Sequence, residues 1–419
     1  MVPDGVTDEV TDGSRVDQTL RASAPGVLAR LAARYGQWEA CEDAVQEAVV
    51  DALRQWPVDG VPADPRGWLT TVARRALVDA WRSDASRRRR EEAVAGKDVP
   101  ADADLAGSSG SDEDDTLVLL FLCCHPALTA PSQLALTLRA MGGLTTAQIA
   151  AAFHVPETTM SQRIRRAKQD VRAAGARFLP PTSEELPGRL AVVEQVLYLL
   201  FNEGYTASSG PELDHPDLAV DAIRLARLLH RLLPDDAEVA GLLALMLLTH
   251  ARRPARSSAD GALVPLEDQD RSRWDRDLIG EGLALLHRTL GRGPIGPYQL
   301  QAAVAALHDE APTADDTDWP QILALYQVLE QVAPSPMARL SRAVAVAHVQ
   351  GPLAGLAVVA TLDDARVSGS HRVDAVRGHL LERAGDPDAA REAYLSAARA
   401  TSSLSERQYL TVRAARLLS

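Results

Sequence analysis

A run of hydroxyl, amide and basic side chains between residues 158 and 168 has the types and the spacing needed to read duplex DNA. The set is Thr158, Thr159, Gln162, Arg163, Arg165, Arg166 and Lys168. Gln and Arg side chains can make paired hydrogen bonds to base edges in the major groove, and Arg and Lys neutralise phosphates. The chemistry predicted for this segment is recognition of nucleic acid without a covalent step.

A second group of arginines lies earlier in the chain, at Arg66, Arg74, Arg75 and Arg82. Residues 66–90 hold eight arginines and two aspartates, and the stretch ends in the run Arg87 to Arg90. Taken alone, such a face is typical of a solvated helix surface, and contact with a nucleic-acid backbone is the alternative. The terminal run leaves two interpretations open, a segment that follows DNA or a disordered basic arm.

Two adjacent thiols and an imidazole, Cys123-Cys124-His125, are candidate zinc ligands. A structural zinc site needs four well-separated ligands, and no partner C-x-x-C motif occurs in the chain. The three residues lie in an apolar run, where free cysteine behaves as a small buried hydrophobe. We therefore predict no metal and no cofactor, and we keep a redox sensor as the alternative.

Three polar segments in the C-terminal half could supply acid–base groups. A hydrolase would pair Glu203 with an acid among residues 267–270 and use His308 as base. No nucleophile motif, phosphate-binding loop or metal-ligand spacing accompanies these residues, so we expect no enzymatic activity. We predict instead that part of this set contacts the rest of the chain or lines a ligand or peptide groove. The predicted interface residues are Asn202, Glu203, Tyr205, Asp268, Asp270, Arg271, Arg273 and Trp274.

The elements that must position the DNA-reading residues are two short helices joined by a tight turn. Hydroxyl caps at residues 145–146 precede an apolar stripe at Ile149, Ala150 and Phe153. A turn follows, and Met160, Ile164 and Val171 then form the inner stripe of a second helix. This pattern predicts a helix-turn-helix, which places the first half of its second helix in the major groove.

Composition restricts the class of protein. The chain has 419 residues and a formal net charge of −13, which argues against a uniformly basic nucleic-acid coat. Its apolar runs are too short to cross a bilayer, and its N-terminus does not resemble a signal peptide. Three cysteines cannot form a disulfide framework. We expect a cytoplasmic, reduced protein that does not associate with a membrane.

The chain divides by pattern into four segments, all helical or unstructured. Amphipathic helices occupy residues 15–83, and an acidic, Gly- and Ser-rich flexible linker covers 84–114. Residues 115–178 hold the helix-turn-helix, and 179–419 form a succession of helices. Small residues near the end of the chain fall at the offsets of a tetratricopeptide repeat, which predicts a stacked helix array. The predicted fold class is all-α.

The sequences quoted so far resemble a known family. LTTAQIAAAFHVPETTMSQRIRRAKQDVR resembles region 4 of bacterial RNA polymerase sigma factors, and CEDAVQEAVVDALRQWP followed by DPRGWLTTVARRALVDAWR resembles region 2. With only these two regions, the chain is similar to the extracytoplasmic-function class. FLCCHPALT, YLLFNEGYTASSG, LEDQDRSRWDR and GPYQLQAAVAALH resemble its subgroup with a long tetratricopeptide-like C-terminal extension.

The resemblance implies roles for individual residues. Asp43, Gln46 and Glu47 match the D-x-x-Q-E core that docks on the polymerase clamp, and region 4 would meet the polymerase flap. The loop at residues 56–65 and the arginines of the next helix match the segments that capture the −10 element. The residues from Thr158 to Lys168 would read the −35 element. The implied partners are core RNA polymerase and promoter DNA, with a regulatory protein or ligand at the extension.

These observations predict a sigma factor that directs promoter-specific initiation and whose C-terminal extension controls or supports its activity. The alternative is a conventional helix-turn-helix regulator with a ligand- or protein-sensing repeat domain. The D-x-x-Q-E helix, lying before the helix-turn-helix, favours the sigma factor.

Overall fold

The computed structural model describes residues 6–91, 112–153, 155–175, 179–205, 216–258, 261–289, 291, 293–362 and 370–418. Within these ranges the regular structure is helical, and the only β pairing is one isolated bridge between Ser257 and Leu263. The predicted all-α fold class is confirmed. Among the same residues, no helix is both long and apolar enough to span a membrane.

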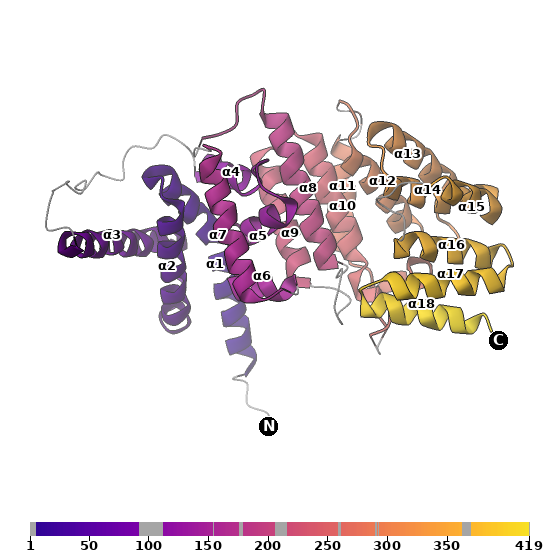
Figure 1. Cartoon of the computed structure of the whole chain (residues 1–419), viewed down its shortest axis with the longest axis horizontal. Coiled ribbons are helices and arrows are strands. Elements are labelled where there is room, and N and C mark those ends of the chain that lie inside the picture. Colours follow the sequence, from indigo (N-terminus) through magenta and orange to yellow (C-terminus); the bar gives the residue numbers. More distant parts are fainter. Residues whose placement is uncertain are drawn as a thin grey trace. The chain divides into compact units, whose positions relative to one another are not determined.

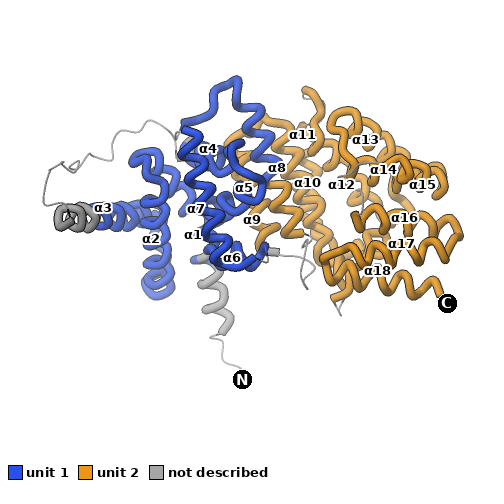
Figure 2. Tube along the Cα trace, in the orientation of Figure 1, with its two compact units in different colours: residues 1–196 blue, residues 197–419 orange. Residues whose placement is uncertain are grey.

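The chain forms two compact units, residues 1–196 and 197–419 (Figure 2). The boundary between the two units falls inside a single helix, α8 (Leu186–Tyr205). The first half of α8 is anchored in unit 1 through Arg189. Its guanidinium donates a hydrogen bond of 2.5 Å to the carbonyl oxygen of Phe121 and lies 6.0 Å from the centre of that phenyl ring.

Unit 1 is an assembly of helices that includes both arginine-bearing segments (Figure 1). Its elements are α1 (Val6–Tyr35), α2 (Trp38–Asp59), α3 (Pro65–Glu91), α4 (Asp112–Cys123), α5 (Ala130–Ala140), α6 (Thr146–Ala152), α7 (Glu157–Ala173) and the start of α8 (Leu186–Tyr205). Helices α1, α2 and α3 pack on one another, and α1 also packs on α4. The predicted apolar stripes are largely buried, with Leu28, Leu31, Leu69 and Leu77 at 3% exposure or less.

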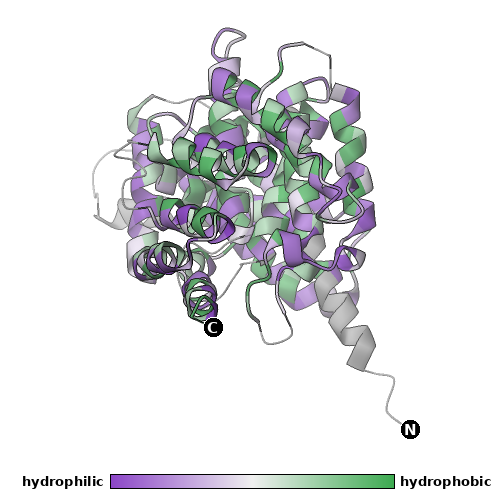
Figure 3. Ribbon diagram, turned by 90° about the vertical axis from the view of Figure 1, so that its right-hand side faces the viewer, coloured by the Kyte–Doolittle hydropathy of each residue, from purple (hydrophilic) through white to green (hydrophobic). Residues whose placement is uncertain are grey.

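Unit 2 continues from α8 as a series of helices that pack on their neighbours along the chain. They are α9 (Pro216–Leu232), α10 (Ala237–Ala251), η1 (Arg253–Ala255), η2 (Leu266–Asp268), η3 (Arg271–Arg273), α11 (Arg276–Thr289), α12 (Pro297–Glu310), α13 (Trp319–Val332), α14 (Pro336–Gln350), α15 (Pro352–Ala360), α16 (His371–Arg383), α17 (Pro387–Ala400) and α18 (Leu404–Arg416). Most helices carry hydrophobic and hydrophilic residues along their length (Figure 3).

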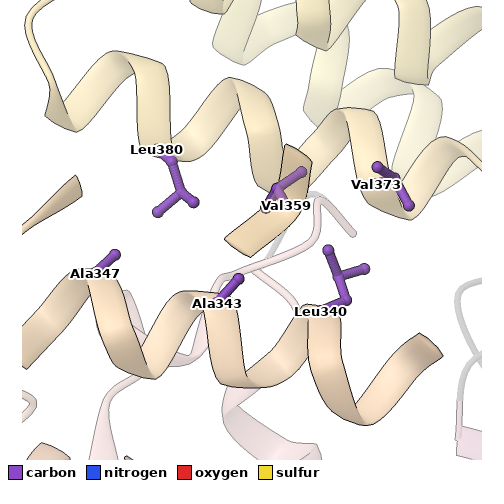
Figure 4. Packing of buried hydrophobic residues seen from close by; sticks show 6 residues of the cluster. All are labelled: Leu340, Ala343, Ala347, Val359, Val373 and Leu380. Carbon is purple, nitrogen blue, oxygen red and sulfur yellow. The ribbon is translucent and has the colours of Figure 1, made fainter. Parts of the chain in front are cut away.

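Small residues allow the helices of unit 2 to approach closely. A Cβ atom added at Gly378 would lie 2.8 Å from the ring of Tyr394, so α16 and α17 need a glycine at this point. Leu340, Ala343 and Ala347 of α14 meet Val359, Val373 and Leu380 of α15 and α16 in one cluster of buried residues (Figure 4). The short apolar side chains leave little space between the helix backbones, as expected for stacked helical pairs.

Candidate nucleic-acid and polymerase interface

Helices α6 and α7 form the predicted helix-turn-helix. The Thr145 hydroxyl accepts a hydrogen bond of 3.2 Å from the Gln148 amide, and the Thr145 amide donates one of 2.8 Å to the Gln148 side chain. This reciprocal cap satisfies two backbone donors at the start of α6. Ile149 of α6 and Met160 of α7 are fully buried, so the predicted inner stripe holds the two helices together.

The opposite face of α7 carries most of the predicted DNA-reading side chains. Thr158, Thr159, Gln162, Arg165 and Arg166 are exposed, and Arg163 is half-buried. They begin in the first turn of α7, because that helix starts at Glu157. An exposed row of hydroxyl, amide and guanidinium groups near a helix N-terminus can contact base edges and phosphates together.

Lys168 departs from this arrangement. We predicted that it faces outward with its neighbours, but its side chain is only 13% exposed. Its ammonium nitrogen lies 2.5 Å from Oε2 of Glu42, a carboxylate of α2 whose side chain is 4% exposed. The reason is a partner far away in the sequence, which helical periodicity within α7 cannot reveal.

The predicted −10 arginines all lie on α3. Arg75 and Arg82 are exposed, whereas Arg66 and Arg74 are half-buried. Arg82 makes an exposed ion pair of 3.7 Å with Asp79, a type of contact that contributes little stability and leaves the guanidinium accessible. The side chains of Arg87 to Arg90 lie outside the described residues, so their two interpretations stay open.

A cavity of about 270 Å³ lies where the start of α3 meets α1. It is lined by Gly26, Val27, Arg30, Asp64, Arg66, Gly67, Thr70 and Thr71. Asp64 accepts a hydrogen bond of 2.9 Å from the Gly67 amide, which fixes the turn that leads into α3. The lining combines guanidinium and hydroxyl donors with a carboxylate, so it suits a polar, anionic ligand better than an apolar one.

The D-x-x-Q-E residues lie on one stretch of α2. Asp43 and Glu47 are exposed and Gln46 is half-buried. Burial, and next the neighbouring Glu42 carboxylate, raise the pKa of Asp43. Val50 and Leu53 follow on α2 with 43% and 45% exposure, although apolar side chains usually face inward. Helical spacing predicts Leu53 on the apolar stripe of this helix, but residue type alone does not say which apolar positions of an amphipathic helix remain uncovered.

The cysteines lie in the interior of unit 1. Cys41, Cys123 and Cys124 are all fully buried. Burial raises the pKa of the Cys41 and Cys124 thiols to about 12 and raises that of Cys123 strongly. Because thiolate is the reactive form, these environments favour the structural interpretation over the redox sensor. Among the described residues, no group of His, Cys, Asp or Glu side chains is arranged to hold a metal ion.

Several residues of the predicted C-terminal interface are used inside unit 2. Arg271 donates to the carbonyl oxygens of His308 and Ala311, at 2.5 and 2.6 Å, and stacks on the ring of Trp274 at 4.7 Å. Trp274 is 3% exposed. Asp270 accepts hydrogen bonds from the Ser272 amide and hydroxyl. These residues hold the segment around η3 against α12, as polar networks between packed helices do.

The remaining interface residues differ in accessibility. The carbonyl oxygen of Tyr205 accepts a hydrogen bond from Arg256, whose guanidinium carbon lies 4.0 Å from the Tyr205 ring centre. Asn202 and Glu203 are half-buried, and Asp268 and Arg273 are exposed. Within unit 2, the exposed pair therefore offers the better candidates for contact with another molecule.

His308, the base of the hydrolytic alternative, lies with its ring 5.3 Å from that of Trp319. Burial, and then Arg252 and Arg271, lower the pKa of His308 to about 3. A general base works best with a pKa near the working pH, so this imidazole is poorly suited to that role at neutral pH. The low pKa of His308 therefore argues against this residue as the base of a hydrolase.

Comparison with known proteins adds independent observations. Residues 20–88 match sigma-70 region 2, residues 119–171 match sigma-70 region 4, and residues 189–290 match a family of unknown function, DUF6596. An uncharacterized protein of Rhizobium meliloti (strain 1021) is 43% identical over 408 residues, which cover 96% of this chain and 95% of the relative. No solved structure matches the chain significantly.

Proposed function

We propose that this chain is an initiation factor of the extracytoplasmic-function class. It belongs to the sigma-70 family of RNA polymerase sigma factors and carries a C-terminal helical extension. Its sigma-70 regions give it a role in promoter-specific transcription, with core RNA polymerase and promoter DNA as partners. The sigma-70 regions are typical of a transcription factor that carries out no covalent chemistry.

The observation that carries this proposal is the pairing of regions 2 and 4, in that order, with an exposed reading face on α7. We assign base contacts at the −35 element to the first turns of α7, through Thr158, Thr159 and Gln162. Arg163, Arg165 and Arg166 supply phosphate contacts and further base contacts. The electrostatic part of such binding is large and depends on salt, because each neutralised phosphate releases counterions.

We assign the −10 element to α3. Its arginines can follow the backbone of the melted strand, and the polar cavity beside Arg66 lies next to the start of that helix. Extruding or melting bases costs several kcal/mol of stacking, roughly, which contacts of this kind must offset. On α2, the exposed Asp43 and Glu47 and the half-buried Gln46 supply the acidic and amide groups that dock on the polymerase clamp.

The extension is assigned a regulatory or supporting role. It comprises most of unit 2, and its exposed Asp268 and Arg273 are charged groups available to a regulatory protein or ligand. Trp274 and Arg271 support this surface from within unit 2. The sigma-type activity itself requires only the elements of unit 1.

Run-off transcription tests the proposal directly. Core polymerase and the full-length protein should initiate from a cognate promoter, selected from a promoter library, without any other sigma factor.

The double variant Arg165→Ala/Arg166→Ala should weaken promoter binding and reduce its dependence on salt, since two phosphate contacts are lost. Arg227→Gln, which removes the exposed Arg227–Glu281 ion pair of unit 2, is the control.

A protein that bound duplex DNA by itself but failed to initiate with core polymerase would be a conventional helix-turn-helix regulator. That outcome would reject the sigma-factor proposal, whatever its affinity for DNA.

A further inference from the structure

The last helix of unit 2 buries one face and leaves the opposite face exposed. Helix α18 follows α16 and α17 in the series (Figure 1), and of the described helices only α17 packs extensively on it. Its inner face joins a cluster of buried residues that α17 and α18 share. The members of this cluster are Ala390, Tyr394, Ala397, Ala398, Leu410 and Ala414.

The exposed side of α18, its outer face, carries no charged side chain. Its residues recur at intervals of four, three, four and three positions, which keeps them on one side of a helix with about 3.6 residues per turn. They are Leu404, Gln408, Thr411, Ala415 and Leu418, and Val412 lies beside them. All six are exposed, and Leu404, Val412 and Leu418 reach 42%, 50% and 69% exposure. The amide of Leu418 donates to the carbonyl oxygen of Ala415 at 3.2 Å, so the last turn continues to the end of this face.

The charged side chains of α18 lie at the borders of the outer face or on the inner side. Arg413 donates to Glu382 of α16 at 3.0 Å, and Glu406 is half-buried. Arg407 and Arg416 are exposed and border the outer face. A terminal helix of a repeat array normally has a polar outer face, because nothing stacks on it. The uncharged outer face of α18 is instead typical of a helix that packs against another surface.

We propose that the outer face of α18 pairs with the same face of a second copy of this chain, with the two helices antiparallel about a two-fold axis near Thr411. A two-fold interface uses one surface patch twice, so that patch must be complementary to itself. In this register, Leu404 of one copy meets Leu418 of the second copy at each end of the interface. Val412 of each copy lies near the axis, beside the small side chains of Thr411 and Ala415, which let the two backbones approach.

The register also keeps like charges apart. Arg407 lies four positions from Thr411 and Arg416 lies five, so the two copies of each arginine are offset by eight and ten residues along the helix axis. These offsets are roughly 12 and roughly 15 Å at about 1.5 Å per residue. Both exceed the screening length of roughly 8 Å at physiological ionic strength, so repulsion between the arginines is weak. A face without any charge of its own favours this like-with-like pairing over a partner recognised by charge.

The size of the outer face sets the strength of the pairing. Helix α18 has 13 residues, which gives a length of roughly 20 Å and, with side chains, a width of roughly 10 Å. The outer face is therefore smaller than the roughly 800 Å² per partner of a standard stable interface. The association should be reversible, with a dissociation constant in the micromolar range. Because every contributing residue lies in unit 2, the inference is independent of the function proposed above.

Sedimentation velocity of the full-length protein tests the pairing. The weight-average mass should rise from that of a monomer toward that of a dimer between about 0.1 and about 100 µM, the span over which a micromolar association becomes populated. The dissociation constant should change little between low and high salt, because burial of apolar surface and not charge drives the pairing. A protein that stays monomeric up to about 100 µM overturns the proposal and leaves the outer face to a different partner.

Charged variants at the two ends of the outer face test the register. Leu404→Glu and Leu418→Arg should each raise the dissociation constant at least about tenfold, because each places a charge against an apolar side chain. An equimolar mixture of the two variants should form a heterodimer with nearly the wild-type dissociation constant, since the new carboxylate of one copy meets the new guanidinium of the other. Both positions are exposed in the monomer, so the variants should keep the fold, which circular dichroism verifies.

The matched control is Leu353→Glu. Leu353 of α15 is 73% exposed and lies outside the outer face of α18, so this change should leave the dissociation constant unaltered. Loss of pairing in this control, or undiminished pairing in Leu404→Glu, would show that the copies associate in another way and would overturn the proposal. A mixture that failed to restore the pairing would contradict the two-fold register on which the proposal rests.

Discussion

At the scale of single residues, His308 shows how packing fixes a protonation state. The ring of Trp319 lies between two imidazoles, 5.3 Å from His308 and stacked 3.6 Å from His348. Burial and nearby cations lower the pKa of His308 to about 3 and that of His348 to about 4. Both histidines are therefore neutral in the folded protein at pH values where an unfolded chain would protonate them.

The stability of unit 2 should consequently fall in mild acid. The ordinary pKa of histidine is 6.5, so between pH 6.5 and about 3 the unfolded chain binds a proton at position 308 that the folded chain does not. Linkage then predicts that stability rises with pH through this window, by up to about 1.4 kcal/mol per pH unit for one such group. Thermal unfolding between pH 7 and pH 5 measures the slope.

The variant His308→Gln should flatten that pH dependence, because its side chain does not titrate. The exposed His287 lies elsewhere in unit 2, and His287→Gln is the matched control. An equal slope in the wild type and in His308→Gln would contradict this account.

Some residue-level features were predictable and others were not. The buried stripe of α7 follows from a repeat of apolar positions, so Met160 and Ile164 were placed correctly. The inward turn of Lys168 depends on Glu42, which is remote in the sequence. Burial of Trp274 and the use of Arg271 as a donor to α12 likewise depend on tertiary contacts, which composition and spacing do not encode.

At the scale of elements, the start of α6 is set by a local signal. Thr145 and Gln148 form a reciprocal cap, and Thr145 is one of the two hydroxyl caps predicted from the sequence, because caps involve residues only three positions apart. Helix ends that depend on distant packing were harder to predict. Helix α2 continues through Pro57 to Asp59, and α8 runs across the boundary of the two units without any break in its pattern.

Removing the cap should weaken both stability and promoter binding. Thr145→Ala loses the hydroxyl that accepts from the Gln148 amide, which should cost about 1 kcal/mol of unfolding free energy. Because α6 supports α7, affinity for a −35 duplex should fall as well. Denaturant unfolding and a salt-controlled binding titration measure the two effects.

The adjacent change Thr146→Ala provides the comparison, since the cap uses only the Thr145 hydroxyl. Equal behaviour of the two variants would show that the cap does not hold the helix-turn-helix in place.

At the scale of the whole molecule, the order of segments was readable because each carries its own charge and apolar pattern. The contact between regions 2 and 4 was not, since Glu42 and Arg139 are 97 positions apart and nothing local links them. Residues 186–196 belong to unit 1, where Arg189 contacts Phe121.

Truncation should therefore be designed around α8. A chain ending at residue 205 keeps the Arg189–Phe121 contact, whereas one ending at residue 179 loses it. We expect the chain ending at residue 205 to retain a folded unit 1. Its transcript yield should differ from that of the full chain, because the regulatory surface is gone. Run-off yields of the full and truncated proteins measure the difference, and circular dichroism verifies the fold.

Identical output from the full chain and the chain ending at residue 205, under every condition tested, would reject the regulatory role of the extension. Greater loss of helical structure in the chain ending at residue 179 would confirm where unit 1 ends.

The inaccessibility of the three native thiols has a practical consequence. Cys41, Cys123 and Cys124 are fully buried, and their raised pKa values leave almost no thiolate at neutral pH. Maleimide dyes should therefore ignore the unmodified protein and react with a cysteine placed on its surface. Fluorophore pairs on α2 and α7 could then report, molecule by molecule, how far these helices separate during initiation, with no native cysteine removed.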